Sequence, residues 1–233
     1  MIDNNEKYTV NKFVFNGYEA TVIRPDKPNG KWIWKTEFLT AFDAAERALL
    51  DLGYTRVYYK ISDKYGSYRA VRLMHDFYKF VVGEFELDER CVLFGFSRGG
   101  LYAFNFALFY PEYVERIYLD APVLDMRTWP PKNSRERSQV YEEYSLTEKT
   151  LETFGGHPIE NLDEFFALDI PLLLVAGGAD EVVPFESNSG RMIEYCKEKG
   201  IKIISIVKPD CKHHPHSLED VTPIIDFVEN RGK

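Results

Sequence analysis

The sequence predicts a single α/β domain, with a mostly parallel sheet that carries helices on both faces. Two observations lead to this fold class. Strand-like and helix-like segments alternate along the chain, and several strand-like segments are almost continuously apolar. Such strands are buried on both faces, which requires helical crossovers on each side of the sheet. The 233 residues, 45% of them hydrophobic, suffice for one such domain.

The chain begins with a predicted antiparallel hairpin at the edge of the sheet. Residues 13–15 and 19–23 are strand-like, and Asn16-Gly17 between them is a dipeptide typical of tight hairpin turns. Further strands are expected at 31–34, 55–61, 91–94, 116–119, 172–176 and 201–207. Apolar spacing predicts helices at 38–52, 68–85, 101–109, 189–199 and 221–230.

The alternation breaks between residues 124 and about 166. Trp129-Pro130-Pro131 and a charged run at 132–148 stand there instead of a strand–helix unit. We expect an inserted cap or helical lid over the carboxyl edge of the sheet. Since no repeat or linker divides the chain, residues 1–233 are interpreted as one domain.

Composition excludes several functional classes. The net charge of -8 argues against general binding to nucleic acid or anionic membranes, which needs clustered basic residues. No apolar stretch reaches the roughly 20 residues that span a bilayer. The polar N-terminus shows no signal peptide, and three scattered cysteines suit reduced thiols. A cytoplasmic protein is expected, although an exported chain trimmed of its leader would look the same.

Ser97 stands at the most informative junction, in Gly95-Phe96-Ser97-Arg98-Gly99 between a predicted strand and a predicted helix. Binding sites of open parallel sheets lie beyond the carboxyl ends of strands. A strand–turn–helix context is what a Gly-x-Ser-x-Gly nucleophile requires, and the helix N-terminus would stabilise a nearby anion. The alternative is a glycine-rich turn with a helix-capping serine.

A serine nucleophile needs an acid and a histidine base on later strand ends. Asp180 follows the strand at 172–176 after two glycines, which permit a sharp turn back across the sheet edge. A loop or capping role is its alternative, and Glu181 and Asp120 are weaker candidates for the acid.

Three histidines follow the last strand in Lys212-His213-His214-Pro215-His216. Because Pro215 restricts the backbone after His214, one side chain of the three can readily face Ser97. His213 is preferred as the base, His214 comes next, and His216 would support the base or contact substrate. No metal site and no cofactor are expected, because carboxylate or cysteine ligands at regular spacing are missing. Of the other histidines, His75 is expected on a helix face and His157 in the lid, as a turn residue or substrate contact.

These three motifs in order resemble the α/β-hydrolase superfamily over nearly the whole chain, about residues 8–228. The resemblance implies an eight-stranded sheet with an antiparallel second strand, and a triad of Ser97, Asp180 and His213. Lys212 stands where the family usually has glycine before the histidine, so the choice between His213 and His214 stays open.

The resemblance also implies an oxyanion hole of two main-chain N–H groups. One is expected from Arg98, the residue after the nucleophile. Many esterases supply the other from a His-Gly step after the third strand, where this chain has Trp32-Ile33-Trp34-Lys35. The second donor is therefore expected near Trp34 or Lys35.

A narrower resemblance, to bacterial hydrolases of carbohydrate esters, is carried by the aromatic third strand and His-His-Pro-His-Ser-Leu. It implies acyl transfer from a small-molecule or glycan ester, such as an acetyl ester. Core or lid packing is the alternative role for the aromatic rings. Rival functions are a peptidase or amidase with the same triad and a non-catalytic binding protein. The acyl group, the alcohol and the oligomeric state stay open. Expected substrate contacts are Trp32, Lys35, Tyr65, Trp129 and His214, with Trp34 beside them.

Overall fold

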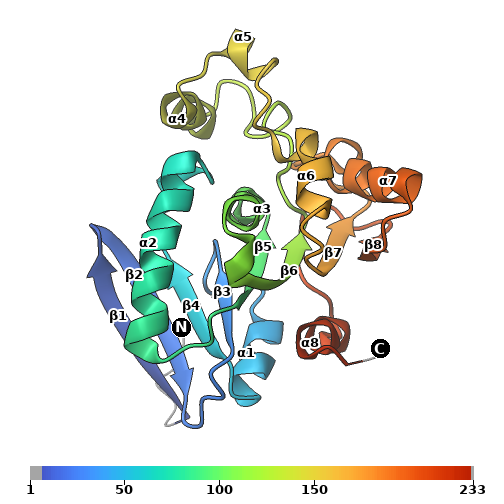
Figure 1. The fold of residues 1–233 in the computed structure, drawn as a ribbon. Coiled ribbons are helices and arrows are strands. Elements are labelled where there is room, and N and C mark those ends of the chain that lie inside the picture. The colour runs from blue at the N-terminus through green and yellow to red at the C-terminus, as the bar shows by residue number, and fades with distance from the viewer. Residues whose placement is uncertain (1–6, 232–233) are drawn as a thin grey trace.

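The computed structural model describes residues 7–231, in which one eight-stranded sheet has the order β1-β2-β4-β3-β5-β6-β7-β8 (Figure 1). The strands are β1 (Tyr8–Phe15), β2 (Tyr18–Pro25), β3 (Trp32–Lys35), β4 (Thr55–Tyr59), β5 (Cys91–Phe96), β6 (Val114–Asp120), β7 (Leu172–Gly177) and β8 (Ile204–Lys208). The α-helices are α1 (Ala44–Asp51), α2 (Tyr68–Phe85), α3 (Gly99–Phe109), α4 (Arg135–Tyr144), α5 (Glu148–Leu151), α6 (Leu162–Phe166), α7 (Ser189–Lys199) and α8 (Thr222–Glu229). Short 3-10 helices are η1 (Ser62–Lys64), η2 (Pro111–Tyr113), η3 (Pro158–Glu160) and η4 (Phe185–Ser187).

The predicted hairpin is confirmed at the edge of the sheet. β1 and β2 pair antiparallel, with Phe15 opposite Tyr18, and Asn16 and Gly17 both have positive φ, as a tight hairpin turn requires. β2 also runs antiparallel to β4, while the strands from β4 to β8 pair in parallel. This is the sheet that the superfamily resemblance implies.

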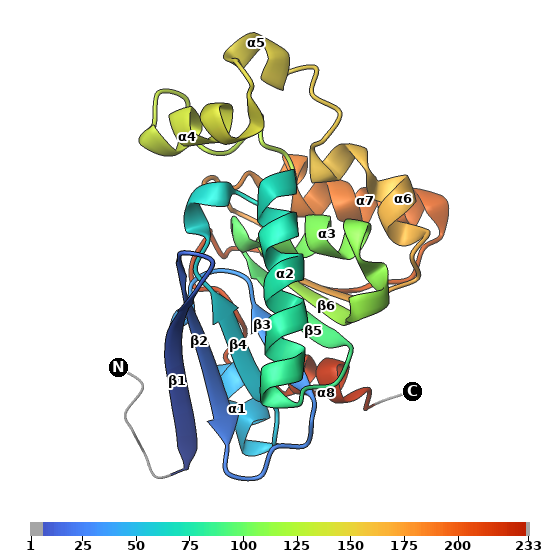
Figure 2. The same cartoon turned by 60° about the vertical axis from the view of Figure 1, so that its left-hand side comes forward.

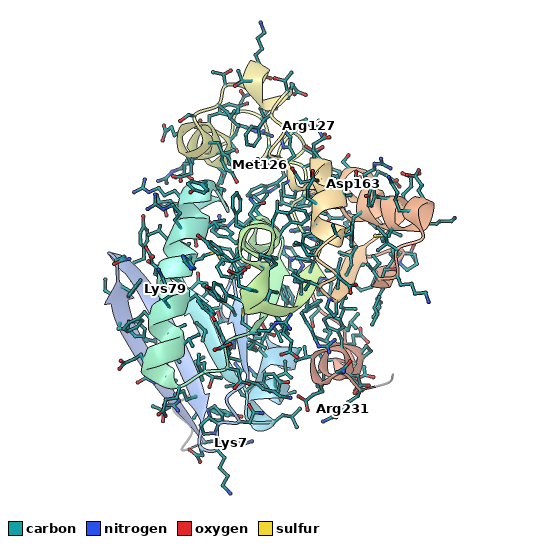
Figure 3. The ribbon with its side chains drawn as sticks, in the orientation of Figure 1. Lys7, Lys79, Met126, Arg127, Asp163 and Arg231 are labelled. Carbon is teal, nitrogen blue, oxygen red and sulfur yellow. The ribbon has the colours of Figure 1, made fainter. Side chains whose placement is uncertain are left out.

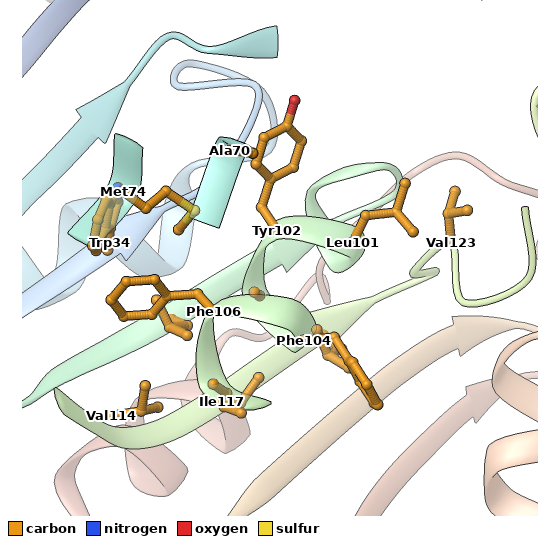
Figure 4. Packing of buried hydrophobic residues seen from close by; sticks show 14 of the residues in the cluster. Trp34, Ala70, Met74, Leu101, Tyr102, Phe104, Phe106, Val114, Ile117 and Val123 are labelled. Atoms are coloured by element: carbon orange, nitrogen blue, oxygen red, sulfur yellow. The ribbon is translucent and has the colours of Figure 1, made fainter. Parts of the chain in front are cut away.

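Two hydrophobic cores lie on opposite faces of the sheet because successive strand residues point to opposite sides. Trp32 and Trp34 of β3 belong to the core under α2 and α3, whereas Ile33 between them belongs to the core under α1 and α8. Figures 1 and 2 show these two helix pairs on either side of the sheet. Trp34 packs near Met74 and Phe106 in the first core (Figure 4).

The first helix is shorter than the predicted 38–52. Residues 38–43 form turns before α1, and both Phe38 and Phe42 have positive φ, which an α-helix excludes. The carbonyl of Ala41 accepts a hydrogen bond from the buried Lys35 Nζ at 3.0 Å. Although the apolar residues of 38–43 have helical spacing, this segment forms a bend that lies against the buried Lys35 ammonium.

The segment that was predicted to form a lid lies between β6 and β7, at residues 121–171, and is called the lid segment below. It contains α4, α5, η3 and α6. Figure 2 shows α4 and α5 beyond the N-terminal end of α2. Tyr144 Oη donates to Tyr65 O at 2.8 Å and Ser67 Oγ donates to Glu143 at 2.7 Å, so the lid is bonded to the segment leading into α2. Figure 3 places Met126 and Arg127 where this segment leaves the sheet edge.

None of the helices within residues 7–231 combines the length and the apolar character needed to cross a membrane.

Candidate active site

Ser97 lies in a tight turn between β5 and α3, as its sequence context predicts. Its φ is +50°, a left-handed conformation that costs energy for a residue with a side chain. The turn is held by Ser97 N–H donating to Asp120 O and by Val123 N–H donating to Ser97 O, each at 2.9 Å. Gly95 allows this close packing, since a Cβ there would stand 2.9 Å from Ala103 Cβ. The surrounding structure therefore holds a strained serine at a strand end.

Ser97, His213 and Asp180 form one chain of hydrogen bonds. His213 Nε2 lies 3.0 Å from Ser97 Oγ, and His213 Nδ1 lies 2.7 Å from Asp180 Oδ2. All three side chains are buried, and they come from three different strand ends. A serine, a histidine and an orienting carboxylate at these distances have the geometry needed for nucleophilic catalysis. The structure thus brings His213, and not His214, to Ser97.

Asp180 is fixed by its own loop. Its Oδ1 accepts hydrogen bonds from the N–H groups of Val182 and Val183 at 2.9 and 3.0 Å, which leaves Oδ2 for His213. The N–H of Ala179 also donates to Cys211 O at 3.0 Å, which ties this loop to the segment carrying His213. Glu181, the neighbouring candidate, is exposed.

The predicted oxyanion donor at Trp34 is wrong. Trp34 lies inside β3, paired with Val57 on one side and Leu93 on the other. Even Thr36 N–H is used, since it donates to Phe94 O at 3.0 Å. Main-chain N–H groups free of the sheet therefore begin at Glu37, two or more residues later than the sequence suggested.

Arg98 lies where the prediction placed it, as the N-cap residue of α3. The N–H groups of Gly100 and Leu101 donate to Ser97 O and Arg98 O, so the N–H groups that lead into the helix before them are those of Arg98 and Gly99. A Cβ at Gly99 would stand 3.5 Å from Glu37 N, so the end of β3 lies against this helix start. The start of α3 and the residues after Thr36 are therefore adjacent.

Three of the predicted substrate contacts are wrong, because their side chains are buried and have partners inside the protein. Trp32 stacks on Trp34 and donates its indole N–H to Asp88 O at 2.8 Å, inside the core. Lys35 is fully buried and pairs with Glu46, so its cation faces α1 and not a ligand. Tyr65 is 1% exposed and hydrogen-bonds to Gln139 of the lid. The rings of Trp32 and Tyr65 and the Lys35 ammonium therefore pack in the interior. Core packing was the alternative role given to the aromatic rings in the sequence.

Trp129 and His214 keep accessible surface. Trp129 is partly exposed in the lid, with its ring 6.3 Å from that of Tyr65. His214 is exposed and stacks on Phe42 with ring centroids 5.6 Å apart. Partial burial, together with His216 and His213, lowers the pKa of His214. Their contact with substrate stays a prediction.

The structure also settles the positions of the two remaining histidines. His75 lies on α2, where its ring stacks on Tyr110 with centroids 4.0 Å apart. His157 is wholly buried, so the suggestion that it contacts substrate is wrong. Its Nδ1 accepts the N–H of Met126 at 3.2 Å and its Nε2 lies 2.9 Å from Leu151 O. His157 therefore ties the lid segment together.

A second carboxylate–histidine pair lies beside the first. Asp120, a weaker candidate for the triad acid, instead bonds to His216, with Oδ1 and Nδ1 2.7 Å apart. The ligand atoms offered by His213, His214 and His216 lie within 4.8 Å of one another. The sequence showed the three histidines together but gave no signal that Asp120 would serve one of them.

Sequence analysis also missed Glu37. This buried carboxylate accepts hydrogen bonds from Arg98 Nε at 3.2 Å and Nη2 at 3.1 Å, and from Ser62 Oγ at 3.0 Å. Burial raises the pKa of Glu37, against the effect of Arg98. The Arg98 guanidinium also lies 5.1 Å from the ring centroid of Phe38. The two segments that flank Ser97 are thus joined through their side chains.

Solved serine hydrolases share this fold at low sequence identity. The acylaminoacyl peptidase of Pyrococcus horikoshii has a TM-score of 0.65 at 13% identity, over 90% of this chain and 38% of its own. A puromycin-hydrolyzing peptidase of Mycobacterium tuberculosis has a TM-score of 0.68 at 14% identity, over 95% and 38%. FphF, a fluorophosphonate-binding serine hydrolase of Staphylococcus aureus, has a TM-score of 0.68 at 15% identity, over 96% and 95%. The shared fold is the α/β-hydrolase fold, and this chain spans little more than a third of the two peptidases.

Sequence comparison adds the family. No protein of curated function matches the chain, and the resemblance to carbohydrate-ester hydrolases is not shown. The model of the prolyl oligopeptidase family matches residues 58–231, well over half of the chain and including Ser97, Asp180 and His213. The chain therefore has the α/β-hydrolase fold and belongs to the prolyl oligopeptidase family.

Proposed function

We propose that this protein hydrolyses an amide or peptide bond of a small substrate through an acyl-enzyme on Ser97. The observation that carries the proposal is the hydrogen-bonded chain from Ser97 Oγ to His213 to Asp180. Membership of the prolyl oligopeptidase family favours a peptide-type bond over a sugar ester. Burial of Trp32, Trp34 and Tyr65 also removes most of the aromatic surface that had suggested a sugar ring.

The proposed reaction begins with proton transfer. His213 Nε2 takes the proton of Ser97 Oγ as that oxygen attacks the carbonyl carbon, while Asp180 holds the Nδ1–H and stabilises the imidazolium. His213 then gives the proton to the leaving amine, and the bond between carbonyl carbon and nitrogen breaks. Water, deprotonated by His213, attacks the acyl-enzyme and releases the acid and Ser97. No cofactor is needed for these steps.

Main-chain N–H groups would stabilise the oxyanion in this reaction. We place one donor at Arg98, at the first turn of α3, and the other at Glu37 or Phe38, directly after the last sheet-bonded residue, Thr36. Hydrogen bonds from main-chain N–H groups strengthen as negative charge develops on the carbonyl oxygen, and they do not depend on the side chain. The ion pair between Arg98 and Glu37 would hold both segments at the required spacing.

A substrate panel with a matched variant tests the proposal. The purified chain is assayed on aminoacyl arylamides, short peptides, short-chain aryl esters and acetylated sugars, alongside Ser97→Ala. We expect hydrolysis of an arylamide or peptide, and a loss of at least about a thousandfold in Ser97→Ala. Cleavage of acetylated sugars without any amide would overturn the substrate class while leaving the mechanism. Absence of Ser97 labelling by a fluorophosphonate probe would overturn the mechanism itself.

A further inference from the structure

A buried carboxylate–histidine pair lies directly behind the triad. Asp120 ends β6, is 1% exposed, and accepts hydrogen bonds at both of its carboxylate oxygens. The donors are Tyr118 Oη at 2.6 Å, Ser217 N–H at 2.7 Å and His216 Nδ1 at 2.7 Å. A buried carboxylate with three donors is strongly fixed, since hydrogen bonds to a charged group are stronger than those between neutral groups.

Asp120 joins the two segments that must meet for catalysis. Its main-chain carbonyl accepts the N–H of Ser97 at 2.9 Å, and its side chain binds His216 and Ser217 beyond the base. The nucleophile turn and the histidine segment are separated by more than a hundred residues in the chain. One residue therefore contacts both.

His216 transmits this constraint to the base. Its ring lies edge to face against His213, with centroids 4.8 Å apart and an interplanar angle of 79°. On its other sides the ring contacts Phe96, next to the nucleophile, at 5.5 Å and Phe42 at 5.4 Å. Lys208 Nζ, by donating to Pro215 O at 2.6 Å and Ser217 O at 2.9 Å, fixes the same segment from β8.

We propose that Asp120 and His216 are positioning residues, which hold the His213 ring at hydrogen-bond distance from Ser97 Oγ. The inference rests on the proposed function, because it assigns His213 as the base. Neither residue exchanges a proton with substrate. Asp120 orients His216 by its carboxylate, and the His216 ring packs against the His213 ring, which His214 also contacts at a centroid distance of 4.8 Å. Since misplacing reacting groups by about 1 Å costs on the order of a hundredfold in rate, such support has a measurable effect.

The competing role for His216 is contact with substrate. It lines a cavity of about 730 Å³ together with Phe42, Leu218 and residues of α1. A substrate contact there would change KM, whereas a positioning residue changes kcat in the bound state. The two roles therefore give different kinetics.

The test compares two substitutions at one position. His216→Asn keeps an N–H close to the place of Nδ1 and can still donate to Asp120, whereas His216→Leu fills similar space without a donor. Active sites are counted with a fluorophosphonate probe, and kcat per titrated site and KM are measured in EDTA, which removes metal from the histidine cluster. We expect His216→Leu to lower kcat about 10- to 100-fold with KM within about threefold, and His216→Asn, which keeps the bond to Asp120 but loses the ring, to recover part of the loss.

Several results would overturn the proposal. Wild-type kcat per titrated site in His216→Leu would mean that the pair only stabilises the fold, and a change confined to KM would mean substrate contact. Equal losses in the Asn and Leu variants would show that the bond to Asp120 is irrelevant. If His216→Leu does not fold, Asp120→Asn tests the pair from its other member, because an amide must turn an N–H toward one of three donors. A wild-type kcat per titrated site in that variant would also contradict the proposal.

Failure of the proposed function would look different. If Ser97 is not the nucleophile, the probe labels no site even in the wild-type protein. If the substrate class is wrong, the probe still labels Ser97 and the kinetic comparison can be made on an aryl ester. The positioning proposal is therefore judged on protein whose Ser97 is labelled, and there it fails on any of the kinetic results described above.

Discussion

In the candidate triad, the hydrogen-bond partners of each side-chain atom leave one role for that atom. Asp180 Oδ1 is occupied by two main-chain N–H groups, so only Oδ2 can orient His213. His213 in turn has one nitrogen for Asp180 and one for Ser97. This arrangement fixes the tautomer of the base without any further residue. It also makes the carboxylate sensitive to replacement by an amide.

Asp180→Asn is predicted to lower kcat by about 10⁴-fold, as loss of the orienting carboxylate does in triad enzymes. The N–H groups of Val182 and Val183 favour the amide oxygen at the place of Oδ1, so the amide N–H turns to His213 Nδ1 and disfavours the tautomer that accepts the Ser97 proton. Steady-state kinetics on the substrate found in the panel measures the effect.

Glu181→Gln is the matched control, since it makes the same chemical change at the adjacent exposed residue. Its kcat should stay within about twofold of wild type. A loss in Glu181→Gln with activity retained in Asp180→Asn would reverse the assignment of the acid.

Buried charge explains how β3, β4 and α1 are held together near the site. Lys35 on β3 and Glu46 on α1 form an ion pair with both side chains fully buried, and Arg56 Nη2 of β4 lies 3.7 Å from Glu46. Burial lowers the pKa of Lys35, and Glu46 opposes that effect. The Lys35 ammonium also lies 3.6 Å from the ring centroid of Phe96, the residue before Ser97.

Glu46→Leu is predicted to reduce the free energy of unfolding by about 3–5 kcal/mol, because it leaves Lys35 as an unpaired buried charge. Arg47→Ala on the same helix is the control, since Arg47 pairs with Asp43 from a half-exposed position and should contribute at most about 1 kcal/mol. Urea denaturation measures both. Equal losses in the two variants would contradict the role given to the buried pair.

The lid segment contains a pH-sensitive contact. His157 is buried as a neutral ring, with Nδ1 accepting from Met126 N–H. Burial lowers the pKa of His157, against the effects of Leu151 O and Asp125. The unfolded chain therefore binds a proton more readily than the folded chain. Stability should fall as pH drops below the ordinary histidine pKa of about 6.5, and level off below the lowered folded value.

His157→Gln should remove that part of the acid sensitivity, because glutamine can donate and accept without titrating. The measurement is the melting temperature of the wild type and the variant between pH 7.5 and 5. As pH falls, the melting temperature of the wild type should decrease more than that of His157→Gln. Parallel curves over the whole range would contradict the assignment.

At the scale of the whole molecule, the lid and the sheet share one core. Leu151, Leu162 and Phe165 of the lid segment belong to the same hydrophobic cluster as Trp32 and Trp34. Phe165 stacks on Phe104 of α3 with ring centroids 4.1 Å apart. Packing of this kind couples the unfolding of the lid to that of the sheet.

We predict a single cooperative transition in urea. Trp32 and Trp34 report on the core and Trp129 on the lid, so fluorescence of the wild type and of Trp129→Phe, together with far-ultraviolet circular dichroism, should give coincident midpoints. A Trp129 signal that changes at lower urea than the other probes would show that the lid unfolds by itself.

Much of this fold and part of the site follow from local chemistry. The Asn16-Gly17 turn, the near-continuous apolar strands and the Gly-x-Ser-x-Gly step each specify a backbone conformation from neighbouring residues alone. The order Ser97, Asp180, His213 is likewise visible along the chain, because the carboxyl ends of parallel strands meet at one edge. The helix expected over 38–52 begins only at Ala44, because Phe38 and Phe42 adopt positive φ in a bend whose Ala41 carbonyl accepts a hydrogen bond from Lys35.

The remaining assignments depended on which face of a strand or loop each side chain occupies. Trp32 and Lys35 look like ligand contacts in sequence, but strand pairing on both sides of β3 turns their side chains into the two buried layers. His213 and His214 are neighbours in the chain, and only the folded structure shows that His213 meets Ser97 while His214 is exposed. Asp120 and His216 are 96 residues apart, so only the folded chain could pair them. Sequence by itself therefore determined the fold class and the kinds of residue at the site, whereas the tertiary structure decided which of those residues meet.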